Sequence, residues 1–111
     1  MNIITKDVRD CLVVTIDGDI DHHFAEDIRN KIDQEFLSKT NKNIIFDFSR
    51  VTFMDSSGIG VIIGRYKLAK SRGGRVIIAC VSSELRRIYE ISGLKKIIPG
   101  FATLDEALRA V

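Results

Sequence analysis

Hydrophobic residues along this chain fall in short blocks whose spacing alternates between that of a strand and that of a helix. Four blocks are short, apolar and rich in β-branched residues, which predicts strands. They are residues 2–7, 11–16, 43–48 and 75–81. Only residues 8–10 separate the first two, which predicts a hairpin, and the β-branched density of 11–16 predicts a position inside the sheet.

Four other segments repeat apolar residues at spacings of three and four, which is typical of helices that face a core. They run from about 21 to 37, from about 57 to 72, from 82 or 83 to about 91, and from 104 to 111. Capping residues support two of the starts, Ser82 or Ser83 for the third helix and Thr103 with Glu106 for the fourth. Residues 95–98 predict a further short strand or extended segment.

These elements follow one another as β-β-α-β-α-β-α-(β)-α within one domain, residues 1–111. Strands that alternate with helices predict an α/β fold with a mixed sheet of four to five strands and about four helices. In open sheets of this class, working sites lie at the carboxyl ends of the strands. The segment that follows the strand 43–48 is therefore the first place to look for a function.

Composition narrows the class of protein. The chain has 111 residues, 45% of them hydrophobic, so it is long enough to bury a core without disulfides. Its net charge of +2 gives no strong attraction to nucleic acid or to an anionic membrane. Five basic residues cluster near the end of the second predicted helix: Arg65, Lys67, Lys70, Arg72 and Arg75. We expect them to favour the negative end of that helix rather than to bind a nucleic acid.

No signal peptide or membrane span is visible in the sequence. Residues 1–7 lack a basic and an apolar region, and no apolar run approaches the roughly 20 residues of a membrane helix. Cys11 and Cys80 each lie in an apolar run, as small buried hydrophobic residues do. We therefore expect a cytoplasmic protein without a disulfide.

Two adjacent histidines, His22 and His23, stand where the first helix is predicted to open. On a helix, neighbouring side chains project in different directions, and no third ligand stands at a fixed spacing from this pair. The sequence thus predicts neither a metal site nor a cofactor. Asp21, or His23 together with Glu26, is expected to cap the helix.

The segment Val51–Gly60, between the strand 43–48 and the next helix, carries the candidate chemistry. It contains Asp55, Ser56, Ser57 and Gly58 in succession, placing hydroxyls and a carboxylate where a helix has unpaired N–H groups. A serine here could be a nucleophile, part of a phosphate-binding loop, a site of modification or a helix cap. These four roles make different demands on the neighbouring residues.

The two catalytic roles fit poorly. A nucleophile elbow needs glycine two residues before the serine, and here Met54 and Asp55 stand there, with His22 or His23 as the only available bases. A phosphate-binding loop needs a lysine after its last glycine, and Gly60 is followed by Val61. A hydrolase or nucleotide-binding domain is therefore disfavoured.

The other two roles stay open from the residues alone. A helix N-terminus suits a phosphoserine, whose charge would change the surface at an exposed turn, although Asp55 opposes it by like-charge repulsion. A simple cap is the plainer interpretation and is slightly favoured. Gly60 and Gly64 stand one turn apart on the following helix, so either the sheet or a partner protein is expected to approach that backbone closely.

A family resemblance adds to these arguments. Residues 53–67, from Phe53 through Asp55-Ser56-Ser57-Gly58 to Lys67, resemble the signature of STAS domains, and more closely that of anti-sigma factor antagonists of the sporulation sigma-F switch. Residues 18–23, 47–48 and 92–98 match the same family in the same order, so the resemblance covers essentially the whole chain.

The resemblance implies that this protein is not an enzyme but the substrate of one. In the family, the anti-sigma factor is an ATP-dependent serine kinase that phosphorylates the serine after the aspartate, here Ser56. The unphosphorylated antagonist binds the anti-sigma factor, with its bound ADP or ATP, and frees the sigma factor. The phosphorylated antagonist lets go, and a serine phosphatase resets it. Neither a nucleic acid nor a membrane is a direct partner.

The partner-binding residues that the resemblance implies lie on matching positions: Asp21, Asp55, Ser56, Ser57, Gly58 and Gly60, and on less distinctive grounds His22, His23, Gly64 and Arg65. Ile59 replaces a frequent Leu, and Asp19 a frequent Glu, both conservatively. Ser57 together with His22 and His23 points to the sporulation branch rather than to the general-stress branch. A STAS module of another partner-switching pathway or scaffold is the main alternative, followed by a nucleotide-binding or hydrolase domain.

Overall fold

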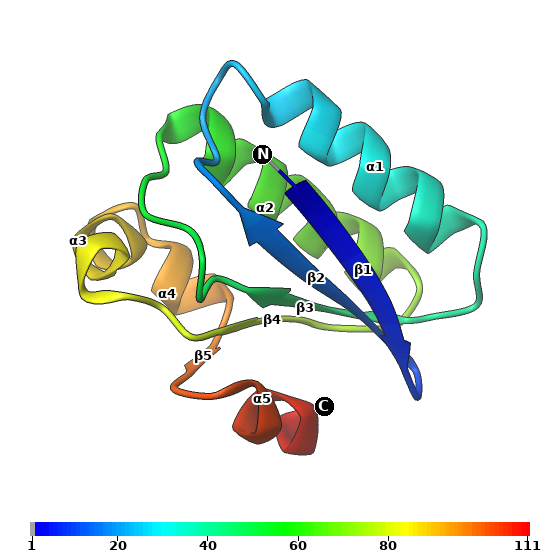
Figure 1. Cartoon of the computed structure of the whole chain (residues 1–111). Helices are drawn as coiled ribbons and strands as arrows, with labels where there is room; N and C mark the ends of the chain where they lie inside the picture. The colour runs from blue at the N-terminus through cyan, green and yellow to red at the C-terminus, as the bar shows by residue number, and fades with distance from the viewer. Residues whose placement is uncertain (1) are drawn as a thin grey trace.

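A computed structural model describes residues 2–111 and shows a five-stranded sheet with helices on both faces (Figure 1). The strands lie in chain order across the sheet: β1 (Asn2–Val8), β2 (Cys11–Asp17), β3 (Asn43–Asp47), β4 (Val76–Ala79) and β5 (Gly100–Phe101). β1 pairs antiparallel with β2, and every later pair is parallel. The carboxyl ends of β2, β3, β4 and β5 therefore share one edge.

Within residues 2–111, five helices cover the sheet: α1 (Ala25–Leu37), α2 (Ser56–Ser71), α3 (Ser83–Ile91), the one-turn α4 (Leu94–Ile97) and α5 (Leu104–Ala110). α1 and α2 lie on one face, and α5 lies on the other (Figure 1). None of the helices in residues 2–111 is long and apolar enough to cross a membrane.

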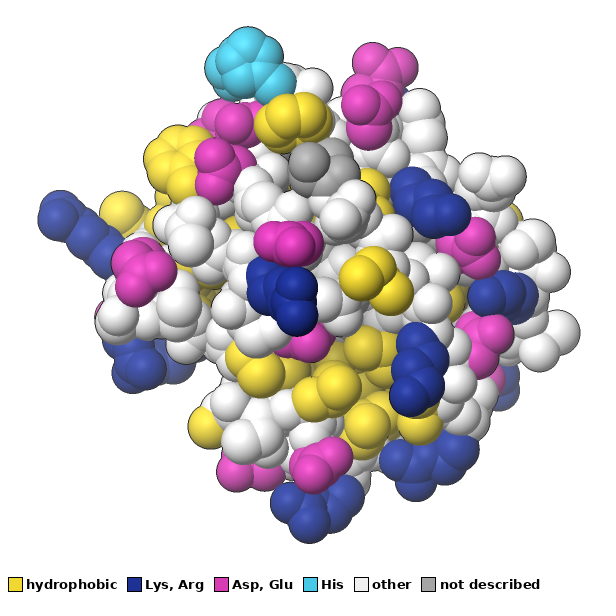
Figure 2. All heavy atoms as spheres, viewed as in Figure 1, with side chains coloured by type: hydrophobic (Ala, Val, Ile, Leu, Met, Phe, Trp, Pro, Cys, Tyr) yellow, Lys and Arg dark blue, Asp and Glu magenta, His cyan; other side chains and the backbone are white. Residues whose placement is uncertain are grey.

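The three central strands, β2, β3 and β4, are apolar on both sides because both faces of the sheet are covered there. Alternate residues of β2 illustrate this: Leu12 and Val14 pack under α1 and α2, whereas Cys11 and Val13 pack against α5. In Figure 2, hydrophobic side chains gather where α5 meets the sheet, a region that includes the partly buried Val8, Leu104 and Leu108. One helix thus covers the whole second core.

The structure confirms the α/β class, the mixed sheet, the hairpin and the interior position of the second strand. Ser82 caps α3 by accepting the N–H of Leu85, and Thr103 caps α5 by accepting the N–H of Glu106. Cys11 and Cys80 are both free, as expected.

Two predicted elements are wrong in detail. Residues 95–98 were expected as a strand or extended segment, but Leu94–Ile97 form the helical turn α4, and the fifth strand lies further on at Gly100–Phe101. Gly93, at φ 82°, makes a left-handed turn that restarts a helix here. The first helix was expected from residue 21, yet it begins at Ala25, because residues 21–24 form a separate turn.

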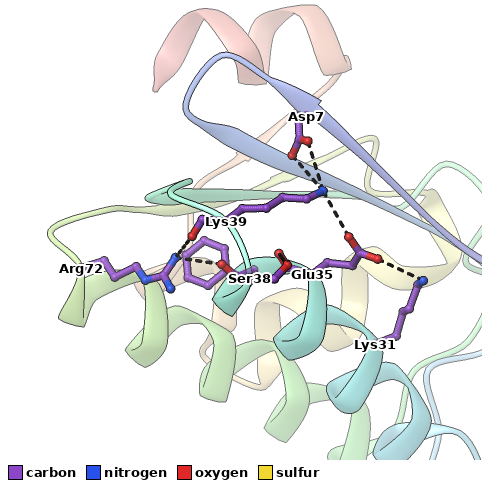
Figure 3. A network of polar contacts seen from close by, with 7 residues as sticks. Asp7, Lys31, Glu35, Ser38, Lys39 and Arg72 are labelled. Atoms are coloured by element: carbon purple, nitrogen blue, oxygen red, sulfur yellow. Dashed lines mark hydrogen bonds and ion pairs between the residues drawn. The ribbon is translucent and has the colours of Figure 1, made fainter.

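The basic cluster does not act as one group on α2. Arg72 donates from Nη1 to the carbonyls of Phe36, Lys39 and Asn41, so it caps the carboxyl end of α1. Figure 3 shows Arg72 beside Ser38 and Lys39 at this end of the helix. Arg75 donates to the carbonyl of Ala110 at the end of α5. Arg72 lies at the carboxyl end of α2 as expected, but Arg72 and Arg75 direct their hydrogen bonds to the ends of α1 and α5.

The end of α1 is also tied to the sheet. Lys39 Nζ lies 3.1 Å from Asp7 Oδ2 of β1 and 3.1 Å from Glu35 Oε2 of α1, and Lys31 lies on the other side of Glu35 (Figure 3). Hydrogen bonds from Lys39 and Lys31 hold the pKa of Glu35 below its ordinary value. These contacts link the carboxyl end of α1 and the residues after it to β1.

Candidate functional site

Two loops meet at the carboxyl edge of the sheet and form the candidate site. Ile20, in the loop after β2, pairs with Met54 in an isolated parallel bridge. The N–H of Ile20 donates to the carbonyl of Phe53 at 3.0 Å, and the N–H of Asp55 donates back to the carbonyl of Ile20 at 3.3 Å. The sequence segments around residues 21 and 55, which the resemblance joined functionally, are thus joined by backbone hydrogen bonds.

Asp55, and not Ser56, caps α2. Its Oδ1 accepts the N–H of Ser57 at 2.9 Å and that of Gly58 at 3.1 Å. Ser56 is the first residue of the helix and is exposed. The expectation that Ser56 caps its helix is therefore wrong: the preceding carboxylate occupies that role and leaves the Ser56 hydroxyl outside the cap.

The Asp55 carboxylate is stabilised in its charged form. Loss of hydration raises the pKa of Asp55, but the N–H groups of Gly58, His22 and Ser57 and the His22 side chain outweigh it, so the pKa lies below its ordinary value. The charge also lies at the positive end of the α2 dipole. The charged Asp55 carboxylate therefore accepts hydrogen bonds from the loop of His22 and from the start of α2.

The two histidines lie in the loop that Asp55 contacts. The backbone N–H of His22 donates to Asp55 Oδ2 at 3.2 Å, and His22 Nδ1 lies 3.5 Å from the same oxygen. The rings of His22 and His23 are 4.0 Å apart, so the expectation that they project in different directions is wrong, because they lie in a turn and not on a helix. The two histidine side chains protrude from the surface (cyan in Figure 2).

Asp21 organises the turn that carries the histidines. Its Oδ1 accepts the N–H groups of His23 at 3.0 Å and of Phe24 at 3.3 Å. The alternative cap, His23 with Glu26, is not used, since Phe24 holds the capping position of α1 without a side-chain hydrogen bond. Asp21 is half-buried, whereas His22 and His23 are exposed.

The glycines of α2 have different environments. A Cβ on Gly58 would collide with the carbonyl oxygen of Ile20, so this glycine permits the close approach of the two loops. A Cβ on Gly60 or Gly64 would meet no atom within 4 Å. The sheet does not approach these two glycines, which removes one of the two explanations foreseen for them and leaves an uncovered surface.

Arg65 lies behind this surface and is only 8% exposed. Its Nε is 3.0 Å from Asp33 Oδ1 on α1, so the pair joins α1 to α2. Burial lowers the pKa of Arg65, Arg29 adds to that shift, and Asp33 opposes it. Arg65 therefore lies inside the helix pair and not among the exposed side chains at the turn.

A groove of about 450 Å³ separates the first turns of α1 and α2. It is lined by His22, Ser57, Gly60 and Arg65, which the resemblance had singled out, and by Ala25, Glu26, Arg29 and Val61. The site thus brings Asp21, His22, His23, Asp55, Ser56, Ser57, Gly58 and Gly60 to one edge, with Arg65 below.

Sequence reasoning missed three residues beside the site. Glu26 and Arg29 line the groove from α1, and Phe53 is 51% exposed next to the Ser56 turn. The stripe Ala25, Ile28, Ile32 does indicate that residues 26 and 29 flank the buried face. Phe53 gave no such signal, because an apolar residue beside a strand is normally taken for core.

The histidines are held by carboxylates and not by the serines. His22 Nδ1 lies 3.5 Å from Asp55 Oδ2, and within residues 2–111 no hydrogen bond joins either histidine to Ser56 or Ser57. What the edge does present is an exposed hydroxyl on a rigid, capped helix start with charged and apolar side chains around it. That is the form of a recognition surface.

The chain belongs to the STAS domain family, whose family model matches residues 2–107. Among characterised relatives, it is 37% identical to the anti-sigma F factor antagonist of Paenibacillus polymyxa, over 82% of this chain and 78% of that protein. It is 33% identical to the anti-sigma-B factor antagonist of Bacillus subtilis, over 88% of each chain.

Solved structures of the anti-sigma factor antagonist SpoIIAA have the same fold as this chain. The unphosphorylated form of the anti-sigma factor antagonist SpoIIAA superposes with a TM-score of 0.83 at 32% identity, covering 99% of this chain and 98% of that one. The phosphorylated form of the Bacillus cell-fate determinant SpoIIAA superposes with a TM-score of 0.74 at 33% identity, covering 98% of each chain. The fold described above is the SpoIIAA fold.

Proposed function

We propose that this chain is an anti-sigma factor antagonist, a regulatory and non-enzymatic protein controlled by phosphorylation of Ser56. In its unphosphorylated form it binds an anti-sigma factor that is also a serine kinase, and the sigma factor is released. Phosphorylation by that kinase, with ATP, abolishes binding, and a serine phosphatase restores it. The protein works in the cytoplasm, without a cofactor and without direct contact with nucleic acid or membrane.

The observation that carries this proposal is the division of roles between Asp55 and Ser56. Asp55 satisfies the first N–H groups of α2, while Ser56 is exposed and takes no part in the cap. A kinase can therefore modify the hydroxyl without removing a stabilising hydrogen bond. The similarity to SpoIIAA, a protein solved in both phosphorylated and unphosphorylated forms, supports the same assignment.

The mechanism follows from charge. The kinase docks over the Ser56 turn and the uncovered glycines of α2, with Asp21 pairing a basic residue of the kinase. A phosphate adds about −1.5 to −2 charges beside Asp55 and against the nucleotide phosphates of the kinase. Like charges at an interface cost several kcal/mol, so affinity collapses with little change in the fold.

Mass spectrometry after incubation with an anti-sigma factor and ATP tests the proposal. The anti-sigma F factor of Paenibacillus polymyxa is a suitable kinase, since its antagonist is 37% identical to this chain. We expect one phosphate on Ser56 and none on the Ser56→Ala variant. Ser57→Ala is the matched control and should still be phosphorylated, because it removes the neighbouring hydroxyl alone.

Binding measurements with the same variants complete the test. Ser56→Ala should bind the kinase and resist release by ATP, whereas Ser56→Asp should bind at least about tenfold more weakly. Equal affinity of Ser56→Asp and the unmodified protein would contradict the charge mechanism. Phosphorylation of Ser57 in place of Ser56 would contradict the assignment of the site.

A second candidate function is that of an antagonist in the general-stress branch. The 33% identity to the anti-sigma-B factor antagonist supports it. The two candidates differ in their kinase. Parallel reactions with an anti-sigma F and an anti-sigma B factor separate them, and we expect faster phosphorylation by the anti-sigma F factor.

A further inference from the structure

The groove between α1 and α2 is an uncovered space beside the Ser56 turn. Gly60 forms part of its lining, and a side chain at Gly60 would meet nothing within 4 Å. The charged side chains of the lining are Glu26, Arg29 and Arg65. None of these three was needed to explain phosphorylation, so the groove requires an explanation of its own.

Arg65 has hydrogen-bond donors without acceptors. Its Nε and Nη1 are buried, and neither makes a hydrogen bond, although Nε lies within ion-pair distance of Asp33. A buried donor without a hydrogen bond lowers the stability of the folded protein, and a donor on a charged group lowers it further. A guanidinium in this condition gains free energy from any acceptor that reaches it through the groove.

Arg29 adds a second positive charge to the same lining. It is exposed on α1, and within residues 2–111 it takes part in no ion pair. Arg65 is already paired with Asp33, which lies behind the groove. Arg29 and Glu26 are therefore the charges of the lining left to face a ligand. The Arg65 donors without a hydrogen bond, together with Arg29, favour an anionic group, and one carboxylate adds less negative charge there than the dianion of a phosphate.

We propose that this groove receives an aspartate or glutamate side chain of the anti-sigma partner, with Arg65 and Arg29 donating to its carboxylate. The inference rests on the proposed function, since it names the chemistry of the partner at the same surface. It assigns Arg29 to the interface and gives the open space at Gly60 an occupant. The carboxylate enters beside Ser57, one residue from the phosphorylated position.

Binding of the 111-residue chain to the anti-sigma F factor of Paenibacillus polymyxa tests the groove. Arg29→Gln should weaken binding at least about tenfold, because a charged hydrogen-bond donor to the carboxylate is lost. Gly60→Leu should weaken it at least as much by filling the groove. Arg109→Gln, an exposed arginine on α5 across the sheet, is the matched control and should bind as the unmodified protein does.

Thermal unfolding of the same variants separates docking from folding. Arg29 is exposed, and position 60 is open, so both variants should melt within a few degrees of the unmodified protein. Weak binding by a variant that is well folded supports the groove. Full binding by both variants, while the unmodified protein binds, overturns it and leaves the proposed function intact.

The NMR resonance of the Arg65 side-chain nitrogen reports whether the anti-sigma factor, inorganic phosphate or ATP enters the groove. It should shift on addition of the anti-sigma factor and stay in place when inorganic phosphate or ATP is added alone. A shift with phosphate or ATP alone would overturn the assignment to a carboxylate of the partner. If the unmodified chain binds neither an anti-sigma F nor an anti-sigma B factor, the proposed function is wrong. The proposal for the groove is then wrong as well, because it rests on that function.

Discussion

At the scale of single residues, the candidate site depends on which of several neighbouring polar side chains takes the cap. Asp55 takes it, and its carboxylate also holds the loop of His22. Ser56 is left exposed. The sequence placed these residues together but could not rank Asp55 and Ser56, because both residue types are good caps and the choice depends on one residue of helix register.

Replacing Asp55 tests its role in stability. Asp55→Ala should lower the free energy of unfolding by about 1 kcal/mol, since two N–H groups of α2 lose their acceptor. Asp55→Asn should cost less, because asparagine also caps helices. Urea unfolding followed by circular dichroism measures both, and equal stability of Asp55→Ala and the unmodified protein would contradict the cap.

The lowered pKa of Asp55 gives this stabilisation a pH dependence. Because the folded pKa lies below that of the unfolded chain, about 3.9, the contribution of the charge is full above that value. It disappears as the pH falls through the folded pKa. The advantage of the unmodified protein over Asp55→Asn should therefore shrink below about pH 4, and an advantage that grew on acidification would have the wrong sign.

At the scale of elements, α2 carries the site through its glycines and through its fit against the neighbouring loop. The spacing of Gly60 and Gly64 predicted a close approach to their face of this helix, and within residues 2–111 that prediction is wrong for both. Only Gly58 makes one, against the carbonyl of Ile20. Helical spacing alone could not distinguish them, because the approaching atom belongs to a loop that is 38 residues away in sequence.

Alanine at two of these glycines should have opposite effects. Gly58→Ala should destabilise the protein by about 1–3 kcal/mol, since the added methyl group forces the loops apart. Gly60→Ala should stabilise it by up to about 1 kcal/mol, since alanine favours the helix and the space is open. Thermal unfolding measures both variants, and a loss of stability in Gly60→Ala would show that its surroundings are not open.

The carboxyl end of α1 depends on a residue of the next helix. Arg72 donates to three carbonyls there, and its guanidinium lies over the Phe36 ring at 4.4 Å from the centroid. Arg72→Met keeps most of the apolar contact and removes the donors, which should cost about 2 kcal/mol. Lys67→Met, on the exposed side of α2, is the control, and an equal loss in both variants would contradict this role.

At the scale of the whole molecule, most of the architecture was predictable and the errors have local causes. Continuous apolar runs such as 43–48 predicted strands, and the two cores show that the central strands are buried on both faces. The segment 95–98 was misjudged because two adjacent isoleucines suggest a strand, whereas Gly93 starts a single helical turn that brings Leu94 and Ile98 into the core. The acceptors of Arg72 and Arg75 could not be predicted, because they lie on elements distant in sequence.

The second core should open when α5 is removed. A variant that ends at Ala102 loses Ala107 and its neighbours, so it should be less stable by at least about 2 kcal/mol. Cys11, which is 2% exposed in the intact protein, should then react many-fold faster with a thiol reagent in a Cys80→Ser background. Arg109→Gln keeps α5 and should leave Cys11 protected, and slow reaction in the shortened variant would mean that α5 is not the cover.

The position of Ser56 outside the cap has a consequence for timing. The phosphorylated and unphosphorylated proteins would differ by the phosphate alone, because Asp55 holds the backbone around Ser56 in both forms. No refolding step would then delay the return to the active form. The duration of each cycle would be governed by the amounts of kinase and phosphatase, so a cell could adjust its response by changing their ratio.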